Sequence, residues 1–301
     1  MKPPPFAYHD PTSIEEAVDL LRRYGGDAKV LAGGQSLMPL LNFRLSYPAA
    51  LVDINRIPAL SYIQHEAGQL RVGALTRQRT LEFSALVREH LPLLYEATTL
   101  VGHLPIRTRG TLGGSLAHAD PAAEYPAVAT ALEAELVVQG SKGQRILRPE
   151  EFFVSYLTTA LAPDEVLVEV RFPTPPPTSG WAFAEFARRH GDFALVGIAA
   201  LLDSEGERCR RARLATAGVG PTPLRLRAAE QILEQGGLTE QSIEAAAVRA
   251  AELVEPDSDL HASAEFRRHL TRVLTRRALR RARARSQERQ AWESKDRSGS
   301  P

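Results

Sequence analysis

The sequence predicts an α+β protein built from two or three compact units. Short runs with helical periodicity alternate with apolar or alternating runs that are typical of strands. A proline-rich segment near residue 175 then separates two such sets of elements. The chain has 301 residues, which is enough for more than one domain, because domains typically span roughly 100–200 residues.

The first 54 residues have the pattern of a small unit with parallel strands. Ser13 is a candidate N-cap with Glu16 three residues later, and apolar residues then recur at helical spacing. The segments "AKVL" (28–31) and "ALVDI" (50–54) are predicted strands, separated by a glycine turn and the helical segment "SLMPLLNFRL". The order helix, strand, turn, helix, strand predicts parallel pairing.

The middle of the chain mixes a hairpin, helices and longer strands. "YIQHEAGQLRVGAL" alternates around a turn signal at Ala67-Gly68, which predicts a hairpin. "TLEFSALVREHLPLLYEATTLVG" is helical, and a second glycine-rich turn, a bend, a helix and a strand follow it. "DEVLVEVRFP" (164–173) is a predicted alternating strand.

The segment "PTPPPTSG" (Pro173–Gly180) is the predicted linker, because prolines disfavour both helix and sheet. Beyond it, "WAFAEFARR" and "FALVGIAALLD" are predicted strands of a separate unit, and alanine-rich helices are expected at 224–235, 239–253 and 262–285. The polar last residues are expected to be disordered. The predicted division is 1–56 and 57–175 for two subdomains, 180–286 for a C-terminal domain, and 287–301 for the tail.

Composition excludes several classes of protein. A net charge of +1 gives no general attraction to nucleic acid. The single cysteine, Cys209, cannot form an internal disulfide or hold an iron–sulfur cluster. The N-terminus lacks the apolar core of a secretory signal, and no stretch is apolar enough for a transmembrane helix. We therefore expect a cytoplasmic protein.

Two glycine pairs lie between apolar segments and have hydroxyl residues beside them. Gly33-Gly34 is followed by Ser36, and Gly113-Gly114 lies between Thr111 and Ser115. Glycines let a backbone approach a ligand closely, and successive backbone N–H groups can form a concave site for an anion. Two such loops could hold a pyrophosphate from opposite sides, but each pair could instead make a tight turn and nothing more.

Other motifs are weaker. Neither glycine pair fits the G-x-G-x-x-G fingerprint or a P-loop, and "GGSLA" lacks the last glycine of a nucleophile elbow. "HADPAAEYP" gathers His118, Asp120 and Glu124, for which we favour hydrogen bonds to ligand hydroxyls or a capped turn over a metal site. Phe193, beside a turn, could cover a planar ligand or belong to a core.

The C-terminal helix is strongly basic. Ten arginines lie between Arg267 and Arg289, around an apolar stripe. Nucleic-acid binding is one interpretation, but no recognition motif supports it. We favour a helix that is solvated, ion-paired or turned toward a partner protein.

Several segments together resemble a known family. They are "VLAGGQSLMPLLNFRLSYPAALVDINRI", "VGALT", "IRTRGTLGGSLAHADPAAEYPAVATALEAEL" and "RRHGDFALVGIAA". The chain resembles the FAD-binding medium subunit of carbon monoxide dehydrogenase-type and xanthine dehydrogenase-type molybdenum hydroxylases, over roughly residues 3 to 285. The resemblance implies an FAD-binding domain of the PCMH type (vanillyl-alcohol-oxidase-like), made of two subdomains. A C-terminal domain of antiparallel sheet and helices would follow it.

The resemblance also implies which residues bind FAD, while it assigns no catalytic residue and no metal to this chain. "KVLAGGQS" and "TLGGS" would hold the pyrophosphate and its neighbourhood. The implied cofactor-binding residues are Lys29, Val30, Leu31, Ala32, Gly33, Gly34, Gln35, Ser36, Leu37, Val101, Thr111, Leu112, Gly113, Gly114, Ser115, Glu124, Leu167 and Phe193.

Three positions depart from the family pattern. Glu124 stands where relatives often have Asp, so the charge is kept and the reach is longer. Phe193 stands where some relatives have a Tyr beside the flavin, and phenylalanine has no hydroxyl to offer. A lysine that some relatives place near Glu185 is absent, so that position receives no role.

The implied function is electron transfer. In the family, a large subunit carries molybdopterin, a small subunit carries two [2Fe–2S] clusters, and FAD on the medium subunit passes electrons to an external acceptor. The complex is expected to be a dimer of heterotrimers, that is, a heterohexamer. The alternatives are a stand-alone FAD-dependent oxidase or dehydrogenase and a scaffold without flavin.

Overall fold

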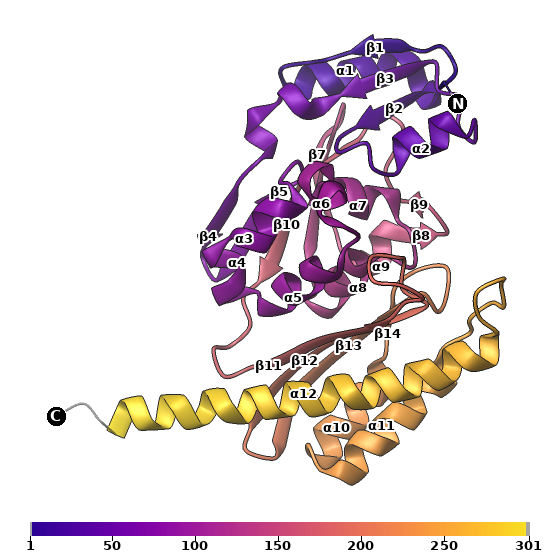
Figure 1. The fold of residues 1–301 in the computed structure, drawn as a ribbon. Helices are drawn as coiled ribbons and strands as arrows, with labels where there is room; N and C mark the ends of the chain where they lie inside the picture. The colour runs from indigo at the N-terminus through magenta and orange to yellow at the C-terminus, as the bar shows by residue number, and fades with distance from the viewer. Residues whose placement is uncertain (1, 299–301) are drawn as a thin grey trace.

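The computed structural model describes residues 2–298, which form three units along the chain (Figure 1). The N-terminal unit has a three-stranded sheet in the order β1-β3-β2, with both strand pairs parallel, which confirms the predicted pairing. Its elements are β1 (Ala7–His9), α1 (Ile14–Tyr24), β2 (Ala28–Leu31), α2 (Leu37–Asn42) and β3 (Ala50–Asp53), followed by short 3-10 turns at Ile54–Arg56 and Pro58–Leu60.

Helix α1 begins where the sequence predicts. The hydroxyl of Ser13 accepts a hydrogen bond of 3.1 Å from the backbone N–H of Glu16, which satisfies one of the free donors of the first turn. Ala17, Val18 and Leu21 form the buried face, which lies against β3. The cap and the apolar stripe therefore fix the position of α1 beside β3, the middle strand of this sheet.

The middle unit has a five-stranded sheet in the order β4-β5-β10-β6-β7, in which every pair is antiparallel. The predicted hairpin is confirmed as β4 and β5. The strands are β4 (Ile63–Glu66), β5 (Gln69–Gly73), β6 (Glu135–Gly140), β7 (Gly143–Leu147), β8 (Phe153–Ser155), β9 (Thr158–Thr159) and β10 (Val166–Pro173). The helices are α3 (Gln78–Phe83), α4 (Ala85–His90), α5 (Pro92–Leu100), α6 (Leu104–Arg109), α7 (Leu112–His118), α8 (Glu124–Ala131) and α9 (Pro149–Phe152).

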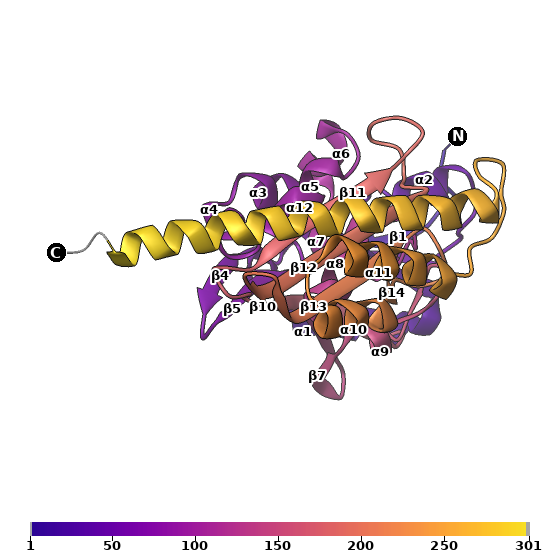
Figure 2. The same cartoon turned by 90° about the horizontal axis from the view of Figure 1, so that it is seen from below.

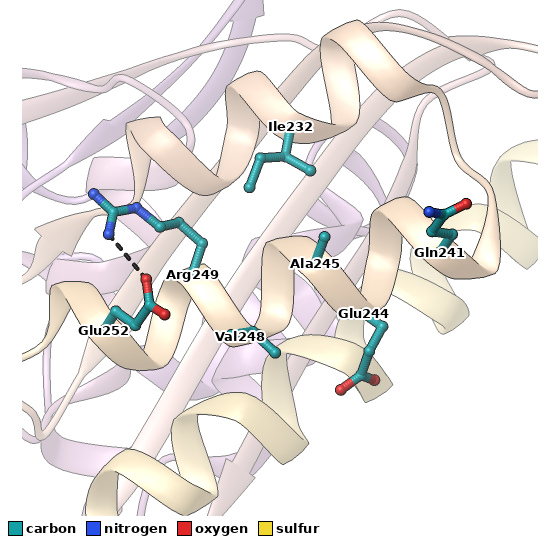
Figure 3. A pocket seen from close by; sticks show the side chains of 7 residues that line it. All are labelled: Ile232, Gln241, Glu244, Ala245, Val248, Arg249 and Glu252. Atoms are coloured by element: carbon teal, nitrogen blue, oxygen red, sulfur yellow. Dashed lines mark hydrogen bonds and ion pairs between the residues drawn. The ribbon is translucent and has the colours of Figure 1, made fainter.

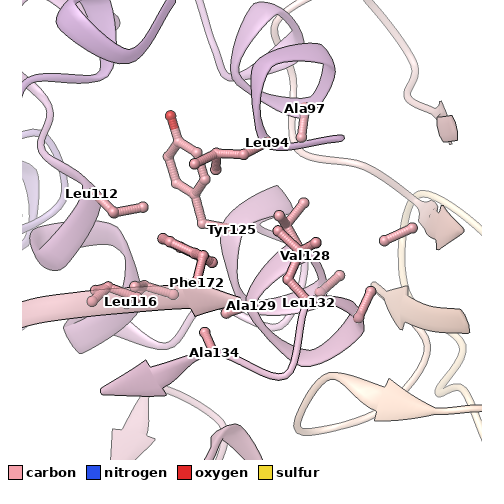
Figure 4. Close-up of a cluster of buried hydrophobic side chains, with 14 of the residues drawn as sticks. Leu94, Ala97, Leu112, Leu116, Tyr125, Val128, Ala129, Leu132, Ala134 and Phe172 are labelled. Carbon is pink, nitrogen blue, oxygen red and sulfur yellow. The ribbon is translucent and has the colours of Figure 1, made fainter. Parts of the chain in front are cut away.

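Strand β10 is the middle strand of this sheet, and both of its faces are buried. Val166 and Val168 pack in the core shared with the N-terminal unit, whereas Leu167 and Phe172 pack among α5, α7 and α8. Figure 4 shows this second core around Tyr125, whose hydroxyl donates to Thr98 Oγ1 at 3.2 Å. The core thus fixes the N-terminal ends of α7 and α8 relative to the sheet.

The C-terminal unit has an antiparallel sheet in the order β11-β12-β13-β14 and three helices. It begins directly after the proline-rich linker. Its elements are β11 (Gly180–Phe186), β12 (Val196–Glu205), β13 (Arg208–Ala217), β14 (Leu224–Arg225), α10 (Arg227–Gly236), α11 (Glu240–Leu253) and α12 (Ala264–Ser298).

This sheet is a layer between the middle unit and its own helices, as Figures 1 and 2 show. Residues on one face, such as Phe183 and Ala199, belong to the core of the middle unit. Alternate residues, such as Ala182 and Ile198, pack against α10, α11 and α12. The period of two in the strands therefore assigns each side chain to one layer or the other.

Six arginines of the basic helix α12 form ion pairs with three glutamates of neighbouring helices. Glu240 and Glu244 of α11 each accept from two arginines, which are Arg272, Arg276, Arg280 and Arg283. Arg281 and Arg285 pair with Glu96 in the middle of α5. Of the three arrangements that the sequence suggested for this helix, which were solvated, ion-paired and turned toward a partner, these six arginines adopt the ion-paired one.

The prediction of a disordered tail from residue 287 is wrong for residues 287–298, which continue α12. The side chain of Gln290 accepts from the backbone N–H of Gly206 at 2.9 Å and donates to the carbonyl of Ser204 at 2.7 Å. The guanidinium of Arg289 lies 4.3 Å from the ring centre of Trp181. These contacts with the sheet extend the helix beyond its apolar stripe. Residues 299–301 lie outside the described part of the chain.

Glu96 joins the middle and C-terminal units, and its replacement tests that junction. Its carboxylate accepts from the backbone N–H of Phe183 and from Arg281 and Arg285. We expect Glu96→Ala to lower the free energy of unfolding by about 1–3 kcal/mol, because the N–H of the buried residue Phe183 loses its acceptor and two arginines lose their carboxylate. Glu252→Ala, in an exposed pair with Arg249, should cost less than about 1 kcal/mol. Urea unfolding followed by circular dichroism measures both, and equal losses would contradict the junction.

Candidate functional site

The first glycine loop, residues 32–36, lies between β2 and α2 and offers backbone donors. Its carbonyl groups are engaged: Asn55 Nδ2 donates to Ala32 at 2.7 Å, Gln35 Nε2 to Gly33 at 3.0 Å, and the N–H of Met38 to Gly34 at 3.1 Å. The N–H groups of residues 33–36, by contrast, donate to no residue between 2 and 298. The carbonyl groups of this loop are therefore occupied, whereas its N–H groups are free and belong to half-exposed residues. Such an arrangement suits the binding of an anion.

The second glycine loop, residues 111–115, is built differently. Thr111 Oγ1 accepts from the N–H of Gly114 at 3.0 Å, which caps α7. The N–H groups of Leu112 and Gly113 donate to the carbonyls of Thr76 and Ala74. The expectation of a second run of free N–H groups is therefore wrong. What this loop leaves available is the hydroxyl of Ser115, which has no hydrogen bond to any described residue.

The two loops touch each other. A Cβ on Gly33 would lie 2.5 Å from the carbonyl oxygen of Arg109 and 2.8 Å from Cα of Gly110. A Cβ on Gly114 would lie 2.6 Å from Thr111 Oγ1, and 3.6 Å from Cβ of Ala32. Distances below 3.0 Å leave no space for a side chain, so glycine is required for this approach. The structure thus brings the two predicted loops together.

Arg77 holds the loops in this contact. Its guanidinium donates to the carbonyl of Arg109 at 2.5 Å and to Asn55 Oδ1 at 2.6 Å. Asn55 in turn holds the carbonyl of Ala32. Burial lowers the pKa of Arg77, and the positive charge of Arg109 lowers it further. Two guanidinium groups beside the loops give the site a positive potential, which complements an anionic ligand.

Most of the remaining predicted cofactor residues lie next to one of the two loops, and Phe193 lies elsewhere. Lys29, Val30 and Leu31 form the end of β2, and Leu37 begins α2. Val101 directly follows α5 as its C-cap, and Leu112, Gly113 and Leu167 are in or beside the core below the second loop. Phe193 is different, because it lies in the loop between β11 and β12 and is 60% exposed.

The Phe193 loop approaches the segment after α5. Gly191 lies against the ring of His103, so closely that a Cβ would collide with it. The rings of His103 and His190 are 6.2 Å apart. The structure therefore brings the Phe193 loop beside Val101–His103, on the same side as the predicted cofactor residue Val101.

Glu124 begins α8 and is 5% exposed. Burial raises its pKa to about 8, and the negative charges of Glu185 and Asp120 add to this effect. Burial also raises the pKa of Glu185, on β11, to about 7. Two carboxyl groups from different units therefore both favour the protonated form.

Of the two other residues in this segment, Asp120 caps a turn and His118 ends α7. Asp120 Oδ1 accepts from the N–H of Ala122 at 2.9 Å, which is the capped turn considered above. Burial lowers the pKa of His118. Between residues 2 and 298, no group of three or more His, Cys, Asp or Glu side chains could hold a metal ion.

A shallow hollow on the outer side of α10 and α11 contains none of the predicted site residues. Ile232, Ala245 and Val248 line it, and the ion pair between Arg249 and Glu252 closes one end (Figure 3). It lies in the C-terminal unit, whereas the glycine loops belong to the first two units. The loops remain the candidate site.

Comparison with known proteins decides what kind of site this is. Residues 4–175 match the model of the family described as FAD binding domain in molybdopterin dehydrogenase. Residues 181–282 match the CO dehydrogenase flavoprotein C-terminal domain. The chain belongs to the FAD-binding medium-subunit family of molybdenum hydroxylase-type dehydrogenases.

Members of this family are similar to the chain over almost its whole length. The 6-hydroxypseudooxynicotine dehydrogenase complex subunit alpha of Paenarthrobacter nicotinovorans is 45% identical, over 94% of this chain and 96% of that protein. The caffeine dehydrogenase subunit beta of Pseudomonas sp. (strain CBB1) is 44% identical, over 94% and 96%. A solved carbon monoxide dehydrogenase structure from Hydrogenophaga pseudoflava superposes with a TM-score of 0.93, at 40% identity, over 95% of this chain and 99% of that one.

The resemblance seen in the sequence is thus confirmed, together with the fold class, the FAD cofactor and the oxidoreductase class. Among residues 2–298, no helix has the length and apolar character that crossing a membrane requires. The free N–H groups of residues 33–36 suit the phosphate-bearing part of FAD, and Gly33 permits the close loop contact that positions them.

Sequence reasoning missed Arg77, Asn55 and Glu185. Arg77 holds the carbonyl of Arg109, 32 residues away, and Asn55 holds the carbonyl of Ala32, 23 residues away, so no local motif predicts these contacts. Glu185 received no role because a family lysine is absent near it. Its burial depends on how two units pack, which sequence alone did not reveal.

Gly33→Ala should abolish FAD retention, because its Cβ would push the first loop away from the backbone at Arg109. The matched control is Gly26→Ala, since a Cβ there meets nothing within 4 Å. FAD content, measured by absorbance of the purified protein, should fall to background in the first variant and stay normal in the second. Full FAD content in Gly33→Ala would contradict the loop assignment.

Arg77→Lys should weaken FAD binding by about tenfold, because an ammonium cannot bridge Arg109 and Asn55 in the same fork geometry. Arg22→Lys, in an exposed pair with Asp19, serves as the control. Fluorescence titration of the FAD-depleted chain gives both dissociation constants. Identical affinities in the two variants would show that Arg77 does not position the loops.

Proposed function

We propose that this chain is the electron outlet of a molybdenum-containing hydroxylase or dehydrogenase. Electrons would arrive from [2Fe–2S] clusters on a small partner subunit and leave through FAD to an external acceptor. The observation that carries the proposal is the contact between two glycine loops, one with free N–H donors, in a chain that spans nearly the full length of medium subunits. When bound, FAD supplies the redox chemistry.

The protein's part is to bind and orient the cofactor. The N–H groups of residues 33–36 and the hydroxyls of Ser36 and Ser115 would hold the diphosphate. Arg77 and Arg109 would stabilise its charge. Val101, Leu167 and the Phe193 loop would lie along the remainder of FAD, as the predicted residue set implies. Such a subunit needs no substrate pocket of its own.

The proposed partners are a small [2Fe–2S] subunit and a large molybdopterin subunit, in a cytoplasmic dimer of heterotrimers. Relatives are named as subunits or medium chains of dehydrogenases, which supports a multi-subunit complex. The stand-alone flavin oxidase and the flavin-less scaffold remain the outcomes against which this proposal is tested.

The test uses the complex purified through a tag on this chain. We expect iron, molybdenum and FAD to copurify, and limited anaerobic dithionite to reduce clusters and flavin together, followed by electron paramagnetic resonance and absorbance. In the complex with Gly33→Ala, the clusters should still be reduced. Their reoxidation by oxygen should be at least about tenfold slower, with Gly26→Ala as the control.

Two results would overturn the proposal. Flavin bleaching when the isolated chain is mixed anaerobically with caffeine or 6-hydroxypseudooxynicotine, the compounds named in two relatives, would favour the stand-alone enzyme. A chain that stays colourless after FAD is supplied would favour the scaffold.

A further inference from the structure

The loop that carries Phe193 has an exposed tip and a buried base. It joins β11 to β12 and spans residues 187–195, in which Phe193 is exposed and Leu195 is buried. The tip lies against the middle unit, because a Cβ on Gly191 would collide with the ring of His103. A residue that holds the base of this loop can therefore set the position of its tip.

Arg267, near the start of α12, holds that base. Its Nη1 donates to the carbonyl of Leu195 at 2.6 Å and to the carbonyl of Gly218 at 3.0 Å. Its Nη2 donates to Asp259 Oδ2 at 2.7 Å. Arg267 is 7% exposed, so water competes little with these bonds, and hydrogen bonds from a charged group are stronger than those between neutral groups. One guanidinium thus joins the ends of β12 and β13 to the segment that precedes α12.

The second of these carbonyls leads to another predicted cofactor residue. The N–H of Gly218 donates to the carbonyl of Pro121 at 2.8 Å. Pro121 belongs to the turn before α8, and Glu124 is the first residue of that helix. A Cβ on Gly218 would lie 2.6 Å from the carbonyl oxygen of Leu195, so the two acceptors of Arg267 are neighbours. The guanidinium is therefore linked by short stretches of backbone to the base of the loop and to the turn before Glu124.

The segment between α11 and α12, residues 254–263, supports this anchor. Asp259 Oδ1 accepts from the N–H groups of His261 and Ala262 at 2.8 and 2.9 Å, which fixes the direction in which its other oxygen faces α12. His261 Nδ1 accepts from Arg188 Nη1, at the beginning of the loop between β11 and β12, at 2.8 Å. The loop is thus held near both of its ends by the same part of the C-terminal unit.

We propose that Arg267 is a positioning residue for the FAD site, whose guanidinium fixes the Phe193 loop over the flavin and the turn that precedes Glu124. It acts on the cofactor only through these two segments. Arginine suits this task, because its planar fork of donors reaches two carbonyls and a carboxylate at once. The proposal rests on the function proposed above, since FAD must be bound for the loop to cover it.

The first test needs no cofactor. Arg267→Met keeps an apolar stem of similar length but removes the donors to both carbonyls. Amide hydrogen exchange of residues 187–195, measured by mass spectrometry on the full FAD-free chain, should become at least about tenfold faster. The matched control is Arg225→Met, which removes another buried, ion-paired arginine on β14, at the opposite edge of the sheet from β11. Exchange of the loop should stay within about twofold in that control.

The second test uses the chain with FAD bound. A loop that covers the flavin shields it from iodide in solution, so the iodide quenching constant of flavin fluorescence reports the position of the loop. Arg267→Met should raise this constant by about twofold or more, and Arg225→Met should leave it unchanged. Phe193→Ala should raise it as well. Adding Arg267→Met to Phe193→Ala should have no further effect, because the arginine acts on the flavin through the loop.

Asp259→Asn keeps the test decisive if Arg267→Met does not fold. The asparagine retains the oxygen that accepts from His261 and Ala262, but it places an amide NH2 group where Arg267 requires an acceptor. Asp259 is exposed, so the fold should tolerate this change. Loop exchange and iodide quenching should both increase, by smaller factors than in Arg267→Met.

Three results would overturn the proposal. Unchanged loop exchange in both Arg267→Met and Asp259→Asn would show that the guanidinium does not hold the loop. Faster exchange with unchanged iodide quenching would make Arg267 a purely structural residue. A further rise in quenching when Arg267→Met is added to Phe193→Ala would show that it acts by another route. If the original chain takes up no FAD, the proposed function itself fails, while exchange in the FAD-free chain still decides whether Arg267 holds the loop.

Discussion

The contact between Gly33 and the backbone at Arg109 is the constraint on which the candidate site depends. It joins a loop of the N-terminal unit to a loop of the middle unit at a distance that only glycine permits. Arg77 completes the contact, because one guanidinium serves an acceptor on each side. The free N–H groups of the first loop are useful only if this contact fixes their direction.

The cores of the three units hold the elements that carry the two loops in place. Strand β10 is apolar on both faces, so it anchors the N-terminal unit on one side and α7 and α8 on the other. The C-terminal sheet then covers α5 and α8 with one face and its own helices with the other. Glu96 and Glu133 form ion pairs with arginines of the C-terminal unit at separate points of this junction. Both loops are thereby mounted on one continuous stack of layers.

Local sequence patterns predicted much of this fold and the position of both glycine loops, but not how the second loop uses its N–H groups. The cap at Ser13, the strand at residues 28–31 and the hairpin around Ala67-Gly68 depend on neighbours in sequence, so their patterns were sufficient. The second glycine loop was harder. Whether its N–H groups are free depends on the carbonyls of Ala74 and Thr76, about forty residues away in sequence. Likewise, the tail was polar enough to suggest disorder, but Gln290 finds partners on β12 that no local pattern reveals.

Helix α12 has a consequence for how the chain folds during synthesis. The four strands of the C-terminal sheet are complete by Arg225, yet α12, the helix that covers much of β11 and β12, begins only at Ala264 and spans 35 residues. Domains form from the N-terminus onward as the ribosome works. The apolar face at Ala182 and Ile198 therefore stays partly uncovered until α12 has been synthesised. Chaperones have their main opportunity at this stage, and a stop codon just before Ala264 would leave that face permanently exposed.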